Sequence, residues 1–376
     1  MAGYIFNLNN ESSLEYSMQN GVYSTLMKLP DTAYWRVNHE GTFADYMTMS
    51  EGDNVYFFFQ RKIYGIGELI NIKGNSKFLN FPSSDLPTDF DYSVLRNKMI
   101  LSNSDENIKN RMLCTFKGSP HFFKKGVDMD EVLSSNPDSF KMLRAFWKRS
   151  FIKIDHKENK ALLDIILKNN EENLITSNNI YHETDTLKNR IINIVNDNYF
   201  VRSENILNCC VNSDGSIGHE MALEAGVLDY IYNKKTSVFG EWDYLTHQVI
   251  ASPFKPIDYM DKMDVFGYRF IKGFNTISKY LVIEIKRGVA DKETVSQLMK
   301  YVDWVNQEYS YGDYNMIEAF VVANHFPDEV KDFKNIFGKR KFTKGTRPAQ
   351  SLEWSNLRLI EYSFDITSKQ LNFYEI

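Results

Sequence analysis

From about residue 185, apolar and polar positions follow two patterns in turn. Some segments repeat apolar residues at helical spacing, and others are short, nearly continuous apolar runs typical of buried strands. We expect helices over 186–196, 219–232 and 292–304, and strands over 263–270, 280–286, 317–323 and 357–364. Such alternation predicts a layered α/β fold for the C-terminal half.

The first 120 residues have a different pattern, with many aromatic residues in short strand-like runs. After the turn signal Glu51-Gly52-Asp53, residues 54–72 read as two strands with a bend at Gln60-Arg61-Lys62. Arg111–Phe116 predicts another strand. These runs indicate a small β-barrel or a strongly curved sheet.

Helical signals follow over residues 128–168, and a polar stretch then interrupts the pattern. Helices are expected to begin near Asp130, Pro137 and Lys157. Asn169–Asn179 is polar and without periodicity, which favours a linker. We therefore expect two domains, residues 1–175 and 176–376, in an α+β or α/β protein.

Composition excludes several classes of protein. The chain has 376 residues, is 43% hydrophobic and carries a formal net charge of −5, which argues against nucleic-acid binding through bulk positive charge. Cys114, Cys209 and Cys210 show no CxxC or Cys/His ligand spacing and are expected to be buried thiols. The N-terminus lacks a signal-peptide pattern, and no run of about 18 apolar residues occurs. A cytoplasmic protein without membrane contact is expected.

Charged residues inside two predicted strands indicate chemistry. Alternation places Asp264 on one face with Phe266, and it places Glu284 and Lys286 on one face of the next strand. Two carboxylates can hold a hard divalent cation such as Mg²⁺ or Mn²⁺, and a lysine can orient or activate water for phosphodiester cleavage. The alternative is that Glu284 and Lys286 form an exposed ion pair on an edge strand.

This pattern resembles the D…ExK signature of the PD-(D/E)xK nuclease superfamily, although no proline precedes Asp264. Gln297 and Tyr301 form a QxxxY pattern on the following helix, similar to that of several branches of the superfamily. The string EIKRGVADKETVSQLMKYV resembles the C-terminal domain of the NucS-like branch and of related restriction-type enzymes. The resemblance covers roughly residues 205–325 and implies a mixed sheet flanked by helices, with DNA as the usual substrate.

The superfamily usually carries a further acid on the helix before the first core strand. Glu220 and Glu224 both lie in the apolar stripe of the helix expected over 219–232, and Glu220 is slightly favoured. The resemblance implies that Asp264, Glu284 and the main-chain carbonyl of Ile285 ligate the metal. It implies that Gln297 and Tyr301 complete the site. Without it, Glu220 and Glu224 could simply favour the helix dipole.

Residues 331–347 are a candidate for holding nucleic acid. This stretch has seven Lys or Arg against one acid, with Phe and Gly between them, and suits a loop or hairpin that grips phosphates. The alternative is a solvated basic loop. The candidate contacts are Lys339, Arg340, Lys341, Lys344 and, beside the ExK strand, Arg287. Arg144, Lys148 and Arg149 either extend this basic path or coat a helix.

The N-terminal part resembles PUA-like modules of the EVE and ASCH type over about residues 30–75. Such modules are small β-barrels that can accept a flipped base in an aromatic pocket. Trp35, Tyr56, Phe58 and Tyr64 could line this pocket, or they could belong to the core.

Taken together, the sequence predicts a Mg²⁺-dependent endodeoxyribonuclease with an N-terminal recognition domain. Restriction of foreign or modified DNA is the expected role, with DNA repair as the alternative. A non-catalytic nucleic-acid-binding protein on the same scaffold stays open, as does an RNA substrate. A homodimer is possible because a two-fold duplex suits a two-fold protein.

Overall fold

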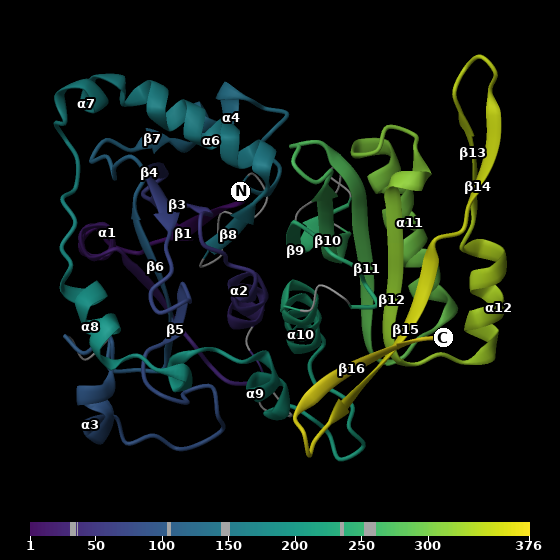
Figure 1. Ribbon diagram of the computed structural model, residues 1–376, viewed down its shortest axis with the longest axis horizontal. Coiled ribbons are helices and arrows are strands. Elements are labelled where there is room, and N and C mark those ends of the chain that lie inside the picture. The colour runs from purple at the N-terminus through teal and green to yellow at the C-terminus, as the bar shows by residue number, and fades with distance from the viewer. Residues whose placement is uncertain (31–34, 36, 104–106, 144–150, 234–236, 252–260) are drawn as a thin grey trace. The chain divides into compact units, whose positions relative to one another are not determined.

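The computed structural model describes residues 1–30, 35, 37–103, 107–143, 151–233, 237–251 and 261–376, with the side chains of 37–41 excepted. It divides into two compact units (Figure 1). The first comprises Met1–Leu29 and Arg36–Arg202, and the second Pro30–Trp35 and Ser203–Ile376. Each unit has its own sheet.

The first unit contains a curled half-barrel sheet of eight strands, in agreement with the curved sheet expected there. Its main path runs β2-β6-β4-β3-β1-β8, with β5 paired to β6 and β7 paired to β4. The strands are β1 (Gly3–Asn7), β2 (Val22–Leu26), β3 (Asn54–Phe59), β4 (Lys62–Leu69), β5 (Lys77–Leu79), β6 (Arg111–Gly118), β7 (Val127–Asp128) and β8 (Phe151–Ile154).

The hairpin between β3 and β4 forms where the sequence predicted it. Gln60 and Arg61 join the strands with φ values of 47° and 62°, both in the left-handed region. A tight two-residue turn needs positive φ at both central positions to match the twist of its strands. Every residue of β3 is buried, which explains its continuous apolar run.

Helices cover the first sheet and extend the unit beyond the expected boundary. They are α1 (Glu11–Asn20), α2 (Val37–Met47), α3 (Tyr92–Leu95), α4 (Met129–Ser135), α6 (His156–Asn169), α7 (Glu171–Thr176) and α8 (Thr186–Ile194). Leu187 and Ile191 of α8 pack in one apolar cluster with Val22 and Phe78. The division between the units therefore falls after Arg202 rather than after residue 175, because α8 buries its apolar side in the first unit.

The second unit has a mixed sheet of six strands in the order β16-β15-β12-β11-β10-β9. Antiparallel pairing joins β9, β10 and β11, whereas β11, β12 and β15 are parallel. The strands are β9 (Tyr244–Ile250), β10 (Lys262–Phe270), β11 (Ile277–Val289), β12 (Ile317–His325), β15 (Leu357–Asp365) and β16 (Gln370–Glu375). The mixed sheet expected for this half is thus confirmed.

Helices connect and flank this second sheet. They are α9 (Ser203–Asn208), α10 (Glu220–Asn233), α11 (Lys292–Glu308) and α12 (Asp328–Phe337). The helix α10 packs against β9, β10 and β11, and α11 packs against β11 and β12. A separate hairpin, β13 (Arg340–Lys344) with β14 (Gln350–Trp354), projects from this unit (Figure 1).

Two local expectations need correction, and a third concerns residues that the structure does not describe. The polar stretch expected as a linker contains the helix α7, which ends at Ser177 in the left-handed conformation. Residues 331–337 belong to α12, so only the later part of the basic stretch is a hairpin strand. Most of the helix expected after Pro137, with Arg144, Lys148 and Arg149, lies outside the described residues.

Cysteine placement agrees with a further expectation. Cys114 and Cys210 are buried and Cys209 is partly buried, and all three are free thiols. Across the part of the chain that the structure describes, every helix is too short or too polar to span a bilayer.

Candidate active site

The site begins where β10 and β11 separate. Val265 pairs with Ile283, so Asp264 and Glu284 are the next residues on the two strands. The Oδ2 atom of Asp264 accepts a hydrogen bond of 2.7 Å from the Ile285 N–H, and the side chain thus takes the place of a strand partner. Both acids are buried, with 8% of Asp264 and 1% of Glu284 exposed.

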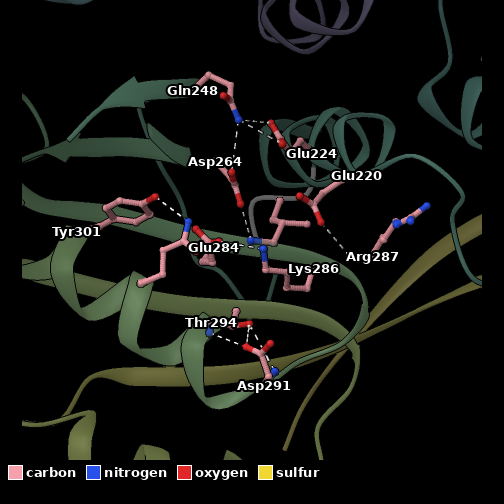
Figure 2. Close-up of polar contacts among 12 residues, drawn as sticks. Glu220, Glu224, Gln248, Asp264, Glu284, Lys286, Arg287, Asp291, Thr294 and Tyr301 are labelled. Carbon is pink, nitrogen blue, oxygen red and sulfur yellow. Dashed lines mark hydrogen bonds and ion pairs between the residues drawn. The ribbon is translucent and has the colours of Figure 1, made fainter. Parts of the chain in front are cut away.

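Lys286 shares a face of β11 with Glu284, as strand alternation predicted. Its Nζ atom lies 3.6 Å from Oε1 of Glu284, and its side chain is 35% exposed. The ammonium group can therefore meet both the buried carboxyl group and a ligand from solvent (Figure 2).

Two acids of α10 approach the same point. Glu220 stands in the first turn, and its Oε2 atom accepts a hydrogen bond of 3.5 Å from the N–H of Arg287. Glu224, one turn later, is 2% exposed and is contacted by the side-chain amide of Gln248 at 3.4 Å. The structure thus brings both candidate acids to the site from α10, with Glu224 facing Gln248 and Glu220 facing Arg287 (Figure 2).

Burial and mutual repulsion raise the pKa of the carboxyl groups. Burial raises the pKa of Glu284, and the charge of Asp264 raises it further. Burial likewise raises the pKa of Asp264 and of Glu224, and the charge of Glu220 adds to the shift of Asp264 while the charge of Asp264 adds to that of Glu224. Burial alone would lower the pKa of Lys286, but the charges of Glu220, Glu284 and Asp264 together outweigh it and raise the pKa. The site therefore favours an added positive charge.

One oxygen of Glu284 is particularly informative. Within the described part of the chain, its buried Oε2 atom has no hydrogen-bond partner. A buried acceptor left in this state costs about 1–3 kcal/mol. A divalent cation that prefers oxygen ligands would give the Oε2 atom of Glu284 a partner.

The residues present fit such a cation only with help from other ligands. No three His, Cys, Asp or Glu side chains among the described residues gather into a complete metal cage. Mg²⁺, however, is typically bound by one or two carboxylates together with waters and substrate phosphates. Asp264 and Glu284 provide that number, and the Ile285 carbonyl stays a predicted third ligand.

The helix α11 carries the QxxxY pair beside this site. It begins with a capping box in which the Asp291 side chain accepts from Thr294 N and the Thr294 hydroxyl interacts with Asp291 N. One turn on, Nε2 of Gln297 donates to the Tyr301 hydroxyl at 2.8 Å. Burial raises the pKa of Tyr301, and the charges of Glu284 and Asp264 contribute to the increase.

Arg287 connects the strand to the start of α10. Its Nη1 atom donates to the Gly218 carbonyl at 2.6 Å, and its own carbonyl accepts from the Tyr362 hydroxyl. These contacts keep Glu220 close to Lys286. The expected contact of Arg287 with nucleic acid stays a prediction.

The basic hairpin candidates are mostly engaged with acids. Arg340 forms a bidentate ion pair with Asp303 of α11, at 2.8 and 2.9 Å. Lys344 lies 2.7 Å from Asp313, and Lys339 lies 3.8 Å from Glu353. Among the described residues, Lys341 has no carboxylate at ion-pair distance and is exposed. Arg340 therefore has a clear structural task, which is to hold the hairpin on α11.

The four aromatic residues expected in a base pocket fall into different surroundings. Trp35 belongs to the second unit, where its ring meets His219 edge-on at 6.3 Å. Tyr56 is fully buried in the first unit and donates to Oδ1 of Asn159 at 2.8 Å. Phe58 is 8% exposed, and the ring of Tyr64 lies against Gly126. A shared pocket for these residues stays a prediction.

Sequence reasoning missed Gln248 of β9. Its Nε2 atom lies 3.4 Å from Oδ1 of Asp264 as well as from both oxygens of Glu224. The available signal was weak, because one polar residue inside Tyr244–Ile250 does not show which side chains it meets. Only the packing of α10 on β9 places Glu224 there.

Comparisons with known proteins give no family. No family model matches the chain, and no curated protein matches it. Among solved structures, the chain is similar to a repair endonuclease from Pyrococcus abyssi, with 26% identity and a TM-score of 0.21 over 30% of this chain and 42% of that one. The matched part is thus less than half of that endonuclease.

Two further solved structures are similar to parts of the chain. One is the Pho92 YTH domain in complex with m6A, with 11% identity and a TM-score of 0.25 over 44% of this chain and 82% of that one. The other is a hypothetical protein from Leishmania major, with 16% identity and a TM-score of 0.26 over 46% of this chain and 97% of that one. All three TM-scores lie below 0.5, so these likenesses carry no argument about function.

Proposed function

We propose that this chain is a metal-dependent endonuclease that hydrolyses phosphodiester bonds of DNA. The observation that carries the proposal is the meeting of Asp264, Glu284 and Lys286 at one point, with an oxygen of Glu284 buried and unpartnered. Buried acids that repel one another are costly unless a cation or a proton neutralises them. Binding of Mg²⁺ or Mn²⁺ would neutralise these acids and would explain why they are clustered.

The proposed roles follow from the placement of each group. Asp264 and Glu284, with the carbonyl of Ile285, would hold the ion. When bound, the ion would neutralise charge that develops on the scissile phosphate. Gln297 and Tyr301 would support the site from α11, and Glu220 or Glu224 would complete it from α10.

Lys286 would act as a cationic hydrogen-bond donor. The neighbouring acids raise its pKa, so it stays an ammonium group at neutral pH. In that state it has three donors and no acceptor, so it can hold the attacking water or a phosphate oxygen but cannot accept a proton. Electrostatic stabilisation of this kind contributes directly to phosphoryl chemistry.

The first unit would select the target, and the second would cut it. We propose restriction of foreign or modified DNA as the role, with the curled sheet of the first unit as a PUA-like reader of the base. The DNA-repair alternative keeps the same chemistry and changes only the structure that is recognised. Cutting both strands with one site per chain would favour a homodimer.

The test is incubation of the purified chain with plasmid DNA in Mg²⁺ or Mn²⁺, with EDTA as the metal-free control. We expect nicking or linearisation that EDTA and Asp264→Asn abolish, while Glu241→Gln, a change at an exposed acid of the same unit, preserves it. Matched DNA and RNA duplexes, and methylated and unmethylated DNA, then define the substrate. DNA binding without any cleavage would refute the nuclease and leave a binding protein.

A further inference from the structure

The backbone of β9 is unusual at one residue. Gln248 has a φ of 54°, in the left-handed region that residues with a side chain rarely adopt, although it lies inside Tyr244–Ile250. The pairing with β10 continues on both sides without a shift, because Val249 pairs with Met263 and His247 pairs with Val265. Gln248 thus stands opposite Asp264 in a strained conformation.

Strain of this type persists only where the surroundings impose it. The conformation departs from regular strand geometry, and the amide of Gln248 meets Asp264 from the neighbouring strand and Glu224 from α10 (Figure 2). A single Nε2 atom lies 3.4 Å from three carboxylate oxygens. The distorted backbone is therefore coupled to a contact that joins a strand acid to a helix acid.

The effect on Asp264 is specific. Its Oδ2 atom accepts from the Ile285 N–H at 2.7 Å, and its Oδ1 atom faces the Gln248 amide at 3.4 Å. Each oxygen has a further lone pair for a metal ion. The two donors together restrict rotation of the carboxylate, and groups that orient a ligand in this way commonly govern metal affinity.

We propose that Gln248 is a positioning residue that orients Asp264 and Glu224 for divalent-cation binding. This inference rests on the proposed nuclease function and adds a residue to its site. Without the amide, the Asp264 carboxylate would be held at one oxygen only, and Glu224 would lose its connection to the strand. The ion would then have to order both groups when it binds.

The test measures Mn²⁺ binding by the full chain without DNA, through the electron paramagnetic resonance signal of the free ion. Gln248→Gly is the main variant, because glycine adopts the positive φ without strain and the change removes only the amide side chain. Gln248→Ala removes the same amide and keeps a Cβ atom. Gln370→Ala, at the exposed start of β16, is the matched control.

We expect both Gln248 variants to bind Mn²⁺ about 10–100-fold more weakly than the wild type, and the control to bind as the wild type does. In plasmid cleavage, the Mn²⁺ concentration for half-maximal rate should rise by a similar factor, while the rate at saturating Mn²⁺ stays within a few-fold. A variant that is partly unfolded would instead show a lower cleavage rate at saturating Mn²⁺.

Two outcomes would overturn the inference in different ways. If Gln248→Gly bound Mn²⁺ as tightly as the wild type, Gln248 would have no positioning role and the nuclease proposal would stand. If the wild type bound no Mn²⁺ and also left plasmid DNA uncut in its presence, the nuclease proposal would fail and this inference would fail with it.

Discussion

Replacement of Glu284 by glutamine should stabilise the metal-free protein while it abolishes metal-dependent cleavage. Glu284 is 1% exposed, and its Oε2 atom has no hydrogen-bond partner in the described part of the chain. Burial raises the pKa of Glu284, and the charge of the nearby Asp264 raises it further, to about 9. Folding at pH 8 therefore requires this carboxyl group to take up a proton. Glutamine keeps the shape of the side chain, is neutral without a proton and can donate a hydrogen bond to Asp264.

The expected size of this gain follows from the buried oxygen. An unsatisfied buried polar group costs about 1–3 kcal/mol, and more when it is charged. Glu284 is also attracted to the ammonium group of Lys286 at 3.6 Å, but Lys286 is 35% exposed and solvent screens this attraction. Loss of the ion pair in Glu284→Gln therefore costs little stability. A gain of 1 kcal/mol raises the melting temperature of a unit of this size by about 2–4 °C, so the gain of about 1–3 kcal/mol should raise it by about 2–12 °C.

The assay is thermal unfolding in EDTA at pH 8, followed by plasmid cleavage in Mn²⁺. Glu241→Gln, an exposed acid of the same unit, controls for a general effect of removing one negative charge. Addition of Mn²⁺ should raise the melting temperature of the wild type and leave Glu284→Gln unchanged. A Glu284→Gln protein that melts below the wild type in EDTA would refute the view that this buried acid is held at a cost to stability.

Three further changes test other parts of the reasoning. Lys286→Ala should keep the fold and Mn²⁺ binding but cleave DNA about 10²–10³-fold more slowly than the wild type. The control Lys300→Ala, at an exposed lysine, should cleave at the wild-type rate. A Lys286→Ala protein with wild-type activity would show that the lysine has no role in cleavage. Burial, with the charge of Asp155, raises the pKa of Glu158 to about 8. The free energy of unfolding of the first unit should therefore fall by up to about 1.4 kcal/mol per pH unit between about pH 5 and 8. Denaturant unfolding of Glu158→Gln should not show this pH dependence. Lys341→Ala should weaken DNA binding on all sequences and reduce the salt dependence by about one unit, measured by fluorescence anisotropy; an unchanged salt slope would exclude Lys341 from phosphate contact.

The core of the second unit was predictable because its apolar pattern is strong. The strands β10, β11 and β12 and the helix α11 are continuous or regularly spaced apolar segments, and their bounds differ from expectation by a few residues. The approach of Asp264 to Glu284 could be anticipated because a period of two places each acid on a defined face of its strand. The contact of Glu284 with Lys286 follows from the same period.

Other elements could not be recognised from local pattern. The strand β9 has Thr246, His247 and Gln248 at its centre, and Thr246 and His247 are 1% and 0% exposed, so burial there is not matched by apolar character. The basic residues of 331–337 conceal an amphipathic helix that packs on α11. In both cases tertiary packing determines what the local sequence leaves undefined.

The roles of the basic residues of 331–347 also depend on tertiary contacts that the local sequence does not show. Charge density along residues 331–347 favoured phosphate contact for Lys339, Arg340, Lys341 and Lys344, but a sequence does not show which acids fold back onto them. Asp303 lies 37 residues before Arg340, and its carboxylate occupies the guanidinium fork at 2.8 and 2.9 Å. A guanidinium engaged in this way must break a bidentate pair before it can bind phosphate, whereas Lys341 has no such pair to lose among the described residues. The contribution of this hairpin to DNA binding should therefore be concentrated at Lys341, and Arg340→Ala should act mainly by releasing the hairpin from α11.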